Sequence, residues 1–144
     1  MDTKERILFS ACLLGVPCRY DGKSVPCEGV IRLKERAQLV PVCPEQLGGL
    51  ATPRTPAERR GESVVTRDGK DVTAQYRRGA QEALRLARLF GCAKAILKSR
   101  SPSCGCGLIY DGSFSGKLIP GEGVTARLLR ENGVEVRTEM DASR

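Results

Sequence analysis

The chain contains no histidine and no tryptophan, and it has few aromatic residues of any kind. Among its 144 residues there are three tyrosines and three phenylalanines. The absence of histidine excludes Ser-His-Asp and Cys-His catalysis, zinc sites built on imidazole, and acid–base chemistry by imidazole. The shortage of aromatic side chains argues against a stacking platform for single-stranded nucleic acid.

Long apolar segments are absent as well. No segment reaches the roughly 18–20 apolar residues that a membrane-spanning helix needs. The apolar run over residues 7–16 is too short and too interrupted for a secretory signal. We therefore expect a cytoplasmic protein with no membrane partner. A chain of this length is typical of one domain, and we expect residues 1–144 to form a single domain.

Cysteine, in contrast, is abundant, with 7 residues in the chain. An odd number cannot pair completely within one chain, and clustered cysteines in the cytoplasm indicate metal or redox chemistry. The net charge of +7 comes from scattered Lys and Arg residues, without the basic run that is typical of a nucleic-acid-binding arm. The scatter favours a solvated surface, and the alternative is a surface that attracts a nucleotide or RNA.

Short apolar runs alternate with segments of helical periodicity. Strands are predicted over residues 7–10, 39–42, 95–98 and 134–136, and helices over 29–36, 73–90 and 125–132. Thr73 is the expected N-cap of the long helix, and Gly91 is expected to end it. This alternation predicts an α/β fold, a single-domain sandwich with a mainly parallel, Rossmann-like sheet.

The segment 63–73 has a different pattern. Val64-Val65-Thr66 and Asp71-Val72 flank Asp68-Gly69, a residue pair that is typical of a tight turn. We expect a small hairpin excursion here, at the edge of the fold. Residues 48–61 and 99–107 are rich in Gly, Pro, Ser and Thr and are expected to form loops.

Three cysteines follow three different predicted strands. Cys12 and Cys43 come directly after the first and second strands, and Cys104 lies in the loop after the third. Because ligands of such sheets lie beyond the carboxyl ends of the strands, we expect these thiols at one edge. Three thiolates suit a soft metal and could hold three irons of a [4Fe–4S] cluster, which usually takes four cysteines. The fourth iron would then be an open Lewis-acid site, as catalysis requires.

Polar residues accompany these cysteines. Glu45 is a natural candidate for acid–base work near a metal in a chain without histidine. The segment 98–105 surrounds Cys104 with hydroxyls and a lysine that could orient a polar substrate or hydrogen-bond cluster sulfur.

Four alternatives stay open at this point. The cysteines could be buried structural thiols, or could serve a structural or redox-sensing metal protein without a substrate. A tetrahedral zinc site could use Cys12, Cys18, Cys104 and Cys106, although their spacing is not the usual knuckle. The positive charge also allows a small RNA-binding module, whose affinity would fall steeply with salt.

Three ordered motifs give the chain a resemblance to a known family, running from about residue 7 to residue 136. They are Ser10-Ala11-Cys12-Leu13-Leu14-Gly15 with Arg19-Tyr20-Asp21-Gly22, Cys43-Pro44-Glu45 with Gly48-Gly49-Leu50 and Pro53-Arg54, and Lys98-Ser99-Arg100-Ser101-Pro102-Ser103-Cys104-Gly105. The chain resembles the short, single-domain family once classed as a domain of unknown function and now associated with thiouracil desulfidase.

The resemblance implies a [4Fe–4S] cluster held by Cys12, Cys43 and Cys104, with Glu45 and Ser101 as catalytic residues. It implies an enzyme that removes sulfur from thiolated uracil, such as 4-thiouracil, 4-thiouridine or its nucleotide, to give uracil and hydrosulfide. The open iron would bind the substrate sulfur, and the carbon–sulfur bond would break without net redox change.

Further expectations concern substrate binding. Ser103, Lys98 and Arg54 are weaker candidates for binding the substrate. The expected partner is a small thiolated pyrimidine base, nucleoside or nucleotide. Thiolated transfer RNA is less expected, because family members linked to it carry a further domain. Cys106 and Cys27 lie outside the motifs and are given no role.

Overall fold

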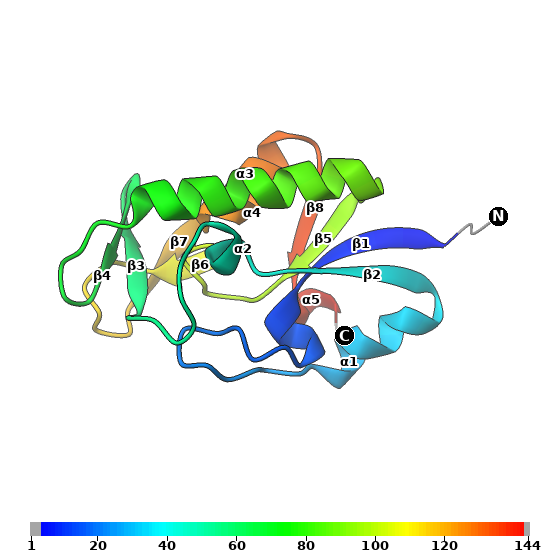
Figure 1. The fold of residues 1–144 in the computed structure, drawn as a ribbon, viewed down its shortest axis with the longest axis horizontal. Helices are drawn as coiled ribbons and strands as arrows, with labels where there is room; N and C mark the ends of the chain where they lie inside the picture. The colour runs from blue at the N-terminus through cyan, green and yellow to red at the C-terminus, as the bar shows by residue number, and fades with distance from the viewer. Residues whose placement is uncertain (1–3, 143–144) are drawn as a thin grey trace.

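A parallel four-stranded sheet forms the centre of the protein, whose computed structural model describes residues 4–142 (Figure 1). Residues 1–3 and 143–144 of the expected domain lie outside this range. In sheet order the strands are β2 (Ala37–Val42), β1 (Glu5–Ser10), β5 (Lys94–Leu97) and β8 (Glu135–Thr138). Each neighbouring pair is parallel, so the predicted α/β, Rossmann-like sheet is confirmed.

Side chains of the sheet are buried on both faces. Leu8 packs into one apolar cluster and its neighbours Ile7 and Phe9 pack into another. Such two-sided burial explains why the central strand is a continuous apolar run. The strand β2 lies at the sheet's edge, where Pro41 can be tolerated without a backbone N–H.

Helices complete the two outer layers. The helices α3 (Thr73–Phe90) and α4 (Val124–Glu131) supply Leu84 and Leu129 to the cluster that contains Leu8. The opposite face carries η1 (Ala11–Leu14), α1 (Glu28–Ile31), η2 (Arg32–Glu35) and α5 (Glu139–Ala142) (Figure 1). The helix expected over 29–36 is therefore an α-helical turn followed by a 3₁₀ turn.

The long helix ends as expected but begins differently. Gly91 adopts a left-handed conformation with φ 69°, which terminates α3. Thr73, however, is the first helical residue and not the N-cap, a position taken by Val72. The Thr73 hydroxyl instead accepts a hydrogen bond from the Val64 backbone N–H at 2.9 Å, which ties the helix to the neighbouring strand.

The hairpin excursion exists, but its strand pairing differs from the prediction. The strand β4 (Ser63–Thr66) pairs with β3 (Ala57–Arg60), inside the segment expected to be a loop. The Asp68-Gly69 turn does form, and one isolated bridge joins Val65 to Asp71. Pairing stops there because the chain turns away to enter α3.

A second hairpin was not predicted. It consists of β6 (Cys106–Tyr110) and β7 (Leu118–Glu122) and is joined to the first through the buried side chain of Glu58. The Glu58 carboxylate accepts hydrogen bonds from the backbone N–H groups of Gly112 (2.9 Å) and Phe114 (3.1 Å). The two hairpins thus form a wall beyond the carboxyl ends of the sheet strands (Figure 1).

Candidate active site

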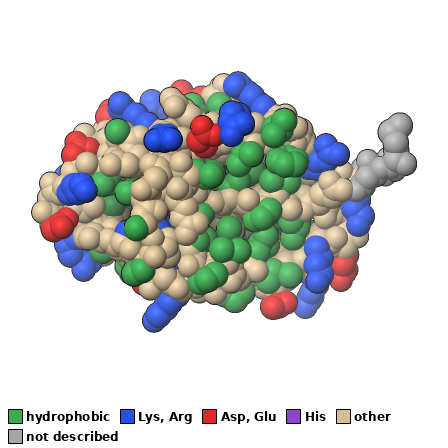
Figure 2. Space-filling model, viewed as in Figure 1, with side chains coloured by type: hydrophobic (Ala, Val, Ile, Leu, Met, Phe, Trp, Pro, Cys, Tyr) green, Lys and Arg blue, Asp and Glu red, His purple; other side chains and the backbone are tan. Residues whose placement is uncertain are grey.

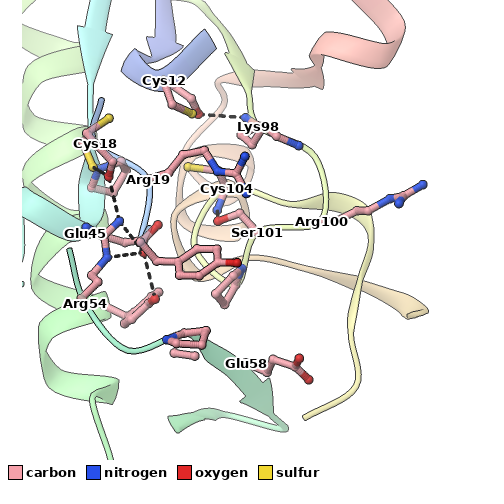
Figure 3. A pocket seen from close by; sticks show the side chains of 18 of the residues that line it. Cys12, Cys18, Arg19, Glu45, Arg54, Glu58, Lys98, Arg100, Ser101 and Cys104 are labelled. Atoms are coloured by element: carbon pink, nitrogen blue, oxygen red, sulfur yellow. Dashed lines mark hydrogen bonds and ion pairs between the residues drawn. The ribbon is translucent and has the colours of Figure 1, made fainter. Parts of the chain in front are cut away.

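The three predicted cysteines meet at one edge of the sheet. Cys12 lies in η1 directly after β1, Cys43 directly follows β2, and Cys104 lies in the turn after β5. All three line a pocket of about 450 Å³ that the hairpin wall closes on its far side (Figure 3). A hydrogen bond of 2.8 Å from the Lys98 backbone N–H to the Ser10 hydroxyl holds the ends of β5 and β1 together.

A fourth thiol, Cys18, also lines this pocket; the sequence suggests it only as a ligand of the alternative zinc site. The Cys43 thiol donates to the Cys18 carbonyl oxygen at 3.7 Å. Hydrogen bonding with the Cys12 thiol is the largest cause that raises the pKa of Cys18, and hydrogen bonding with Cys18, followed by burial, raises the pKa of Cys43. Burial raises the pKa of Cys104 to about 12, although hydrogen bonds with Ser10 and Ser103 oppose the shift.

The pocket is lined by thiols, yet the described residues contain no group of three or more cysteine or carboxylate side chains arranged to hold a single metal ion. Cluster ligands differ from single-ion ligands, because each cysteine binds a different iron and the sulfurs need not converge on one point. The donor set and its spread therefore fit a cluster better than a zinc ion. In particular, Cys106 is not among the pocket residues, so the alternative zinc quartet is not assembled.

The segment 98–105, which we call the serine loop, fixes Cys104. The Ser101 hydroxyl oxygen accepts hydrogen bonds from the backbone N–H groups of Ser103 (3.1 Å) and Cys104 (3.0 Å). Its own hydrogen is not used in these bonds and can be donated into the pocket. Gly105 is required here, because a Cβ atom would lie 2.6 Å from the Ser101 carbonyl oxygen.

Two other serine-loop candidates are placed differently. Ser103 is fully buried, its hydroxyl lies 2.8 Å from the Thr125 hydroxyl, and it is not among the pocket residues. The structure therefore does not bring Ser103 to the expected substrate. Lys98 does line the pocket, and its ammonium group forms an ion pair of 3.1 Å with Glu139 of α5.

The opposite part of the pocket, which we call the carboxylate side, consists of Glu45, Arg54 and Tyr76 (Figure 3). Glu45 lies in the short helix α2 (Pro44–Leu47), one residue beyond the proline that starts it. Arg54 lines the pocket as predicted, but its guanidinium contacts the Glu45 carboxylate at 3.0 Å and donates to the Cys18 carbonyl at 2.9 Å. The Tyr76 hydroxyl donates to the same carboxylate at 3.1 Å.

A close crossing of two helices sets the position of Glu45. Gly48, which caps α2, and Gly79 of α3 face each other. A Cβ atom on Gly48 would overlap the Gln75 carbonyl, and one on Gly79 would overlap the Pro44 carbonyl. The two glycines thus allow backbone-to-backbone contact that brings Tyr76 over Glu45.

Cationic side chains surround the rest of the pocket. Arg19 and Arg67 line it and lie over the rings of Tyr20 (5.7 Å) and Phe114 (5.6 Å), respectively. On the molecular face shown in Figure 2, Lys and Arg side chains are spread among acidic ones and form no continuous basic patch. The positive charge is therefore scattered, as the sequence indicates, with a local excess at the pocket.

Comparison with known proteins identifies the family. Residues 7–141 match the 2-thiouracil desulfurase family. The chain belongs to this family. It is 45% identical over 143 residues to YbbK of Bacillus subtilis (strain 168), a protein described as uncharacterised, with 92% of this chain and 95% of that protein covered.

A solved structure supports the family assignment. It is that of the [4Fe–4S]-dependent thiouracil desulfidase TudS, with a TM-score of 0.91 and 50% sequence identity, covering 96% of this chain and 93% of that one. The predicted family resemblance is confirmed. Among residues 4–142, no helix is both long and apolar enough to span a membrane.

Several side chains that line the pocket are not identified by the sequence, among them Tyr76, Arg67 and Glu58. Tyr76 lies in the long helix predicted over residues 73–90, and its hydroxyl contacts a residue 31 positions away in sequence. Cys18 lies in an irregular segment after η1, where no periodicity predicts its direction. The one signal that could have found Tyr76 is that a buried tyrosine hydroxyl needs a polar partner.

Proposed function

We propose that the protein is a [4Fe–4S]-dependent desulfidase that hydrolyses thiolated uracil to uracil and hydrosulfide. One observation carries the proposal: three cysteines from three adjacent strands share a pocket with a carboxylate. Family membership and the similarity to TudS support the same cofactor and substrate class. In this proposal, residues 1–144 act as a single desulfidase domain.

The residues present fit a cluster with three protein ligands. Cys12, Cys43 and Cys104 would hold it, since thiolates are the usual ligands of such clusters. When bound, the cluster supplies a Lewis-acidic iron without a cysteine ligand, which polarises the thiocarbonyl group. All seven cysteines are free thiols, which favours a reducing compartment such as the cytoplasm.

The chain's own residues supply the remaining chemistry. Glu45 serves as the general base that takes a proton from the attacking water. Ser101 donates its remaining hydroxyl hydrogen to the pyrimidine ring and so orients it. Water adds to the ring carbon, the carbon–sulfur bond breaks, and the sulfur leaves as hydrosulfide, so no electron donor is needed.

The cationic pocket favours an anionic form of the substrate. Arg19 and Arg67 line the pocket, and guanidinium groups are well suited to bind phosphate. A nucleotide such as 4-thio-UMP would place its base toward the cysteines and its phosphate toward these arginines. Lys98 is a further candidate for this contact, although Glu139 already neutralises part of its charge.

The test is anaerobic loading with iron and sulfide, followed by a substrate series. We expect about four irons per chain, the content of one cluster, and loss of thiocarbonyl absorbance with 4-thio-UMP. Comparison with 4-thiouracil and 2-thiouracil separates the role of the phosphate from the position of the sulfur. We expect the nucleotide to give the lowest KM.

A matched pair of cysteine variants provides the control. Cys104→Ser is expected to lose the iron, whereas Cys106→Ser, two residues away and outside the pocket, is expected to keep it. Iron binding without turnover of any thiopyrimidine would refute the activity. Equal iron content in both variants would refute the proposed ligands.

A further inference from the structure

The two oxygens of the Glu45 carboxylate differ in their contacts. Arg54 contacts Oε2 through Nε at 3.1 Å and through Nη2 at 3.0 Å, and the Tyr76 hydroxyl donates to Oε2 at 3.1 Å. Within residues 4–142, no hydrogen bond is made to Oε1. Oε2 is therefore held by two hydrogen bonds and an ion-pair contact, while Oε1 keeps its lone pairs available.

The two holding groups come from different directions. Arg54 lies in the loop before β3, and its Nη1 is fixed in turn by the Ala51 carbonyl (3.2 Å) and the Thr52 hydroxyl (2.9 Å). Tyr76 comes from the first turn of α3, just before Gly79, the residue at which α3 contacts α2. Donors on two sides prevent the carboxylate from rotating about its terminal bond, which either donor alone would permit.

Tyr76 is suited to a fixed donor role. It is 3% exposed and packs with Val64 and Val72. Burial first, and then the Glu45 charge, raise the pKa of its phenol, so the hydroxyl stays protonated. In the folded protein at neutral pH, the Tyr76 hydroxyl is therefore a hydrogen-bond donor to Glu45.

We propose that Tyr76 is a positioning residue for the reaction: together with Arg54 it holds Oε2 of Glu45 and leaves Oε1 as the oxygen that receives the proton. This inference rests on the proposed function of Glu45. It also assigns Arg54 to the carboxylate and not to the substrate. Tyr76 itself contacts no reacting atom.

The first experiment compares Tyr76→Phe with the wild type, both loaded anaerobically. The ring and its packing are kept and only the hydroxyl is lost. We expect kcat to fall about 10-fold, since misplacement of a reacting group is costly, whereas KM and iron content should stay unchanged. A wild-type protein without turnover would refute the proposed function, whereas an active wild type with an equally active Tyr76→Phe variant would refute the positioning role.

The same substitution in a Glu45→Gln background separates positioning from a general structural effect. If Tyr76 acts through Glu45, adding Tyr76→Phe to Glu45→Gln should lower the residual rate no further. A structural role would lower the rate by the same factor in both backgrounds, and that result would overturn the proposal.

A second readout needs no turnover. The chain has no tryptophan and three tyrosines, so its intrinsic emission reports tyrosine alone. A carboxylate that accepts a phenolic hydrogen bond quenches this emission, because it takes up the proton in the excited state. In the full chain before iron loading, Glu45→Gln should raise the emission, and it should have no such effect when Tyr76 is already Phe. Equal emission with and without the Glu45 carboxylate would show that the contact is not made and would overturn the proposal.

Discussion

The two sides of the pocket hold their reactive groups by different means. On the carboxylate side, Glu45 depends on side chains from separate elements, the loop that carries Arg54 and the helix that carries Tyr76. On the serine loop, Ser101 and Cys104 are held by hydrogen bonds within a few residues. Glu45 is thus positioned by side chains from distant elements, whereas Cys104 is fixed by the Ser101 hydroxyl within the loop, which α4 and α5 anchor through Ser103 and Ser99.

Because of this difference, substitutions on the two sides should impair the enzyme in two distinct ways. Loss of a single polar contact on the carboxylate side, as in Tyr76→Phe, should misplace the base while the thiols stay where they are. A change in the serine loop should move Cys104 itself and so affect iron binding. Variants on each side, measured for iron content, stability and turnover, test whether the two sides fail in these different ways.

The largest effect is expected from Gly79→Ala. The new methyl group would overlap the Pro44 carbonyl, and backbone atoms on both sides cannot give way as a flexible side chain can. Overpacking of this kind costs about 3 kcal/mol or more. For a chain of this size we expect the melting temperature to fall by at least about 6 °C, with loss of turnover because α2 and Glu45 are displaced from α3.

A matched control is Gly69→Ala. Gly69 has open space around it but a φ of +88°, so an alanine there adds backbone strain without crowding. The expected cost is about 1–2 kcal/mol, with turnover retained. If Gly79→Ala lowered the melting temperature and turnover no more than Gly69→Ala, the contact between Gly48 and Gly79 would not be what positions the carboxylate side.

A smaller effect is expected from Ser101→Ala. Two backbone N–H groups lose their acceptor, at about 1 kcal/mol each. Because one of them belongs to Cys104, iron content should fall together with stability, whereas Tyr76→Phe should leave iron content intact. Ser101→Thr keeps the acceptor oxygen and should restore iron binding. Full iron retention in Ser101→Ala would contradict the role of the Ser101 hydroxyl in fixing Cys104.

The sequence predicted the serine loop and the cysteines better than the carboxylate side. Parallel strands place their carboxyl ends at one edge, so Cys12, Cys43 and Cys104 could be brought together from periodicity alone. Residue spacing could not predict which serine of the loop faces the pocket; the family resemblance favoured Ser101, and Ser103 instead bonds to Thr125 of α4. That choice depends on packing against a helix far along the chain.

The contacts that the sequence did not reveal are long-range and carried by side chains. Tyr76 has helical periodicity, which predicts burial but not the partner of its hydroxyl. The second hairpin was missed because Gly107, Pro120 and Gly121 interrupt the alternation expected of strands. The pairing of β4 with β3 was missed because the Asp-Gly turn favoured the nearer partner.

The smallest effect is expected from Glu139→Gln, behind the serine loop. Glu139 accepts hydrogen bonds from the Ser99 backbone N–H (2.8 Å) and hydroxyl (3.0 Å) and pairs with Lys98. Glutamine keeps one acceptor oxygen but loses the ion pair, in which Glu139 is buried and Lys98 is partly exposed, at a cost of about 1 kcal/mol. We expect a melting temperature lowered by about 2–4 °C, less so at high salt, with unchanged iron content and kcat.

The Lys98 side chain, released from Glu139, should instead lower the KM for 4-thio-UMP. The KM for 4-thiouracil should stay unchanged, because only the nucleotide carries a phosphate. A fall in kcat comparable to that of Tyr76→Phe would show that the serine loop, and not only the carboxylate side, controls the position of the reacting groups.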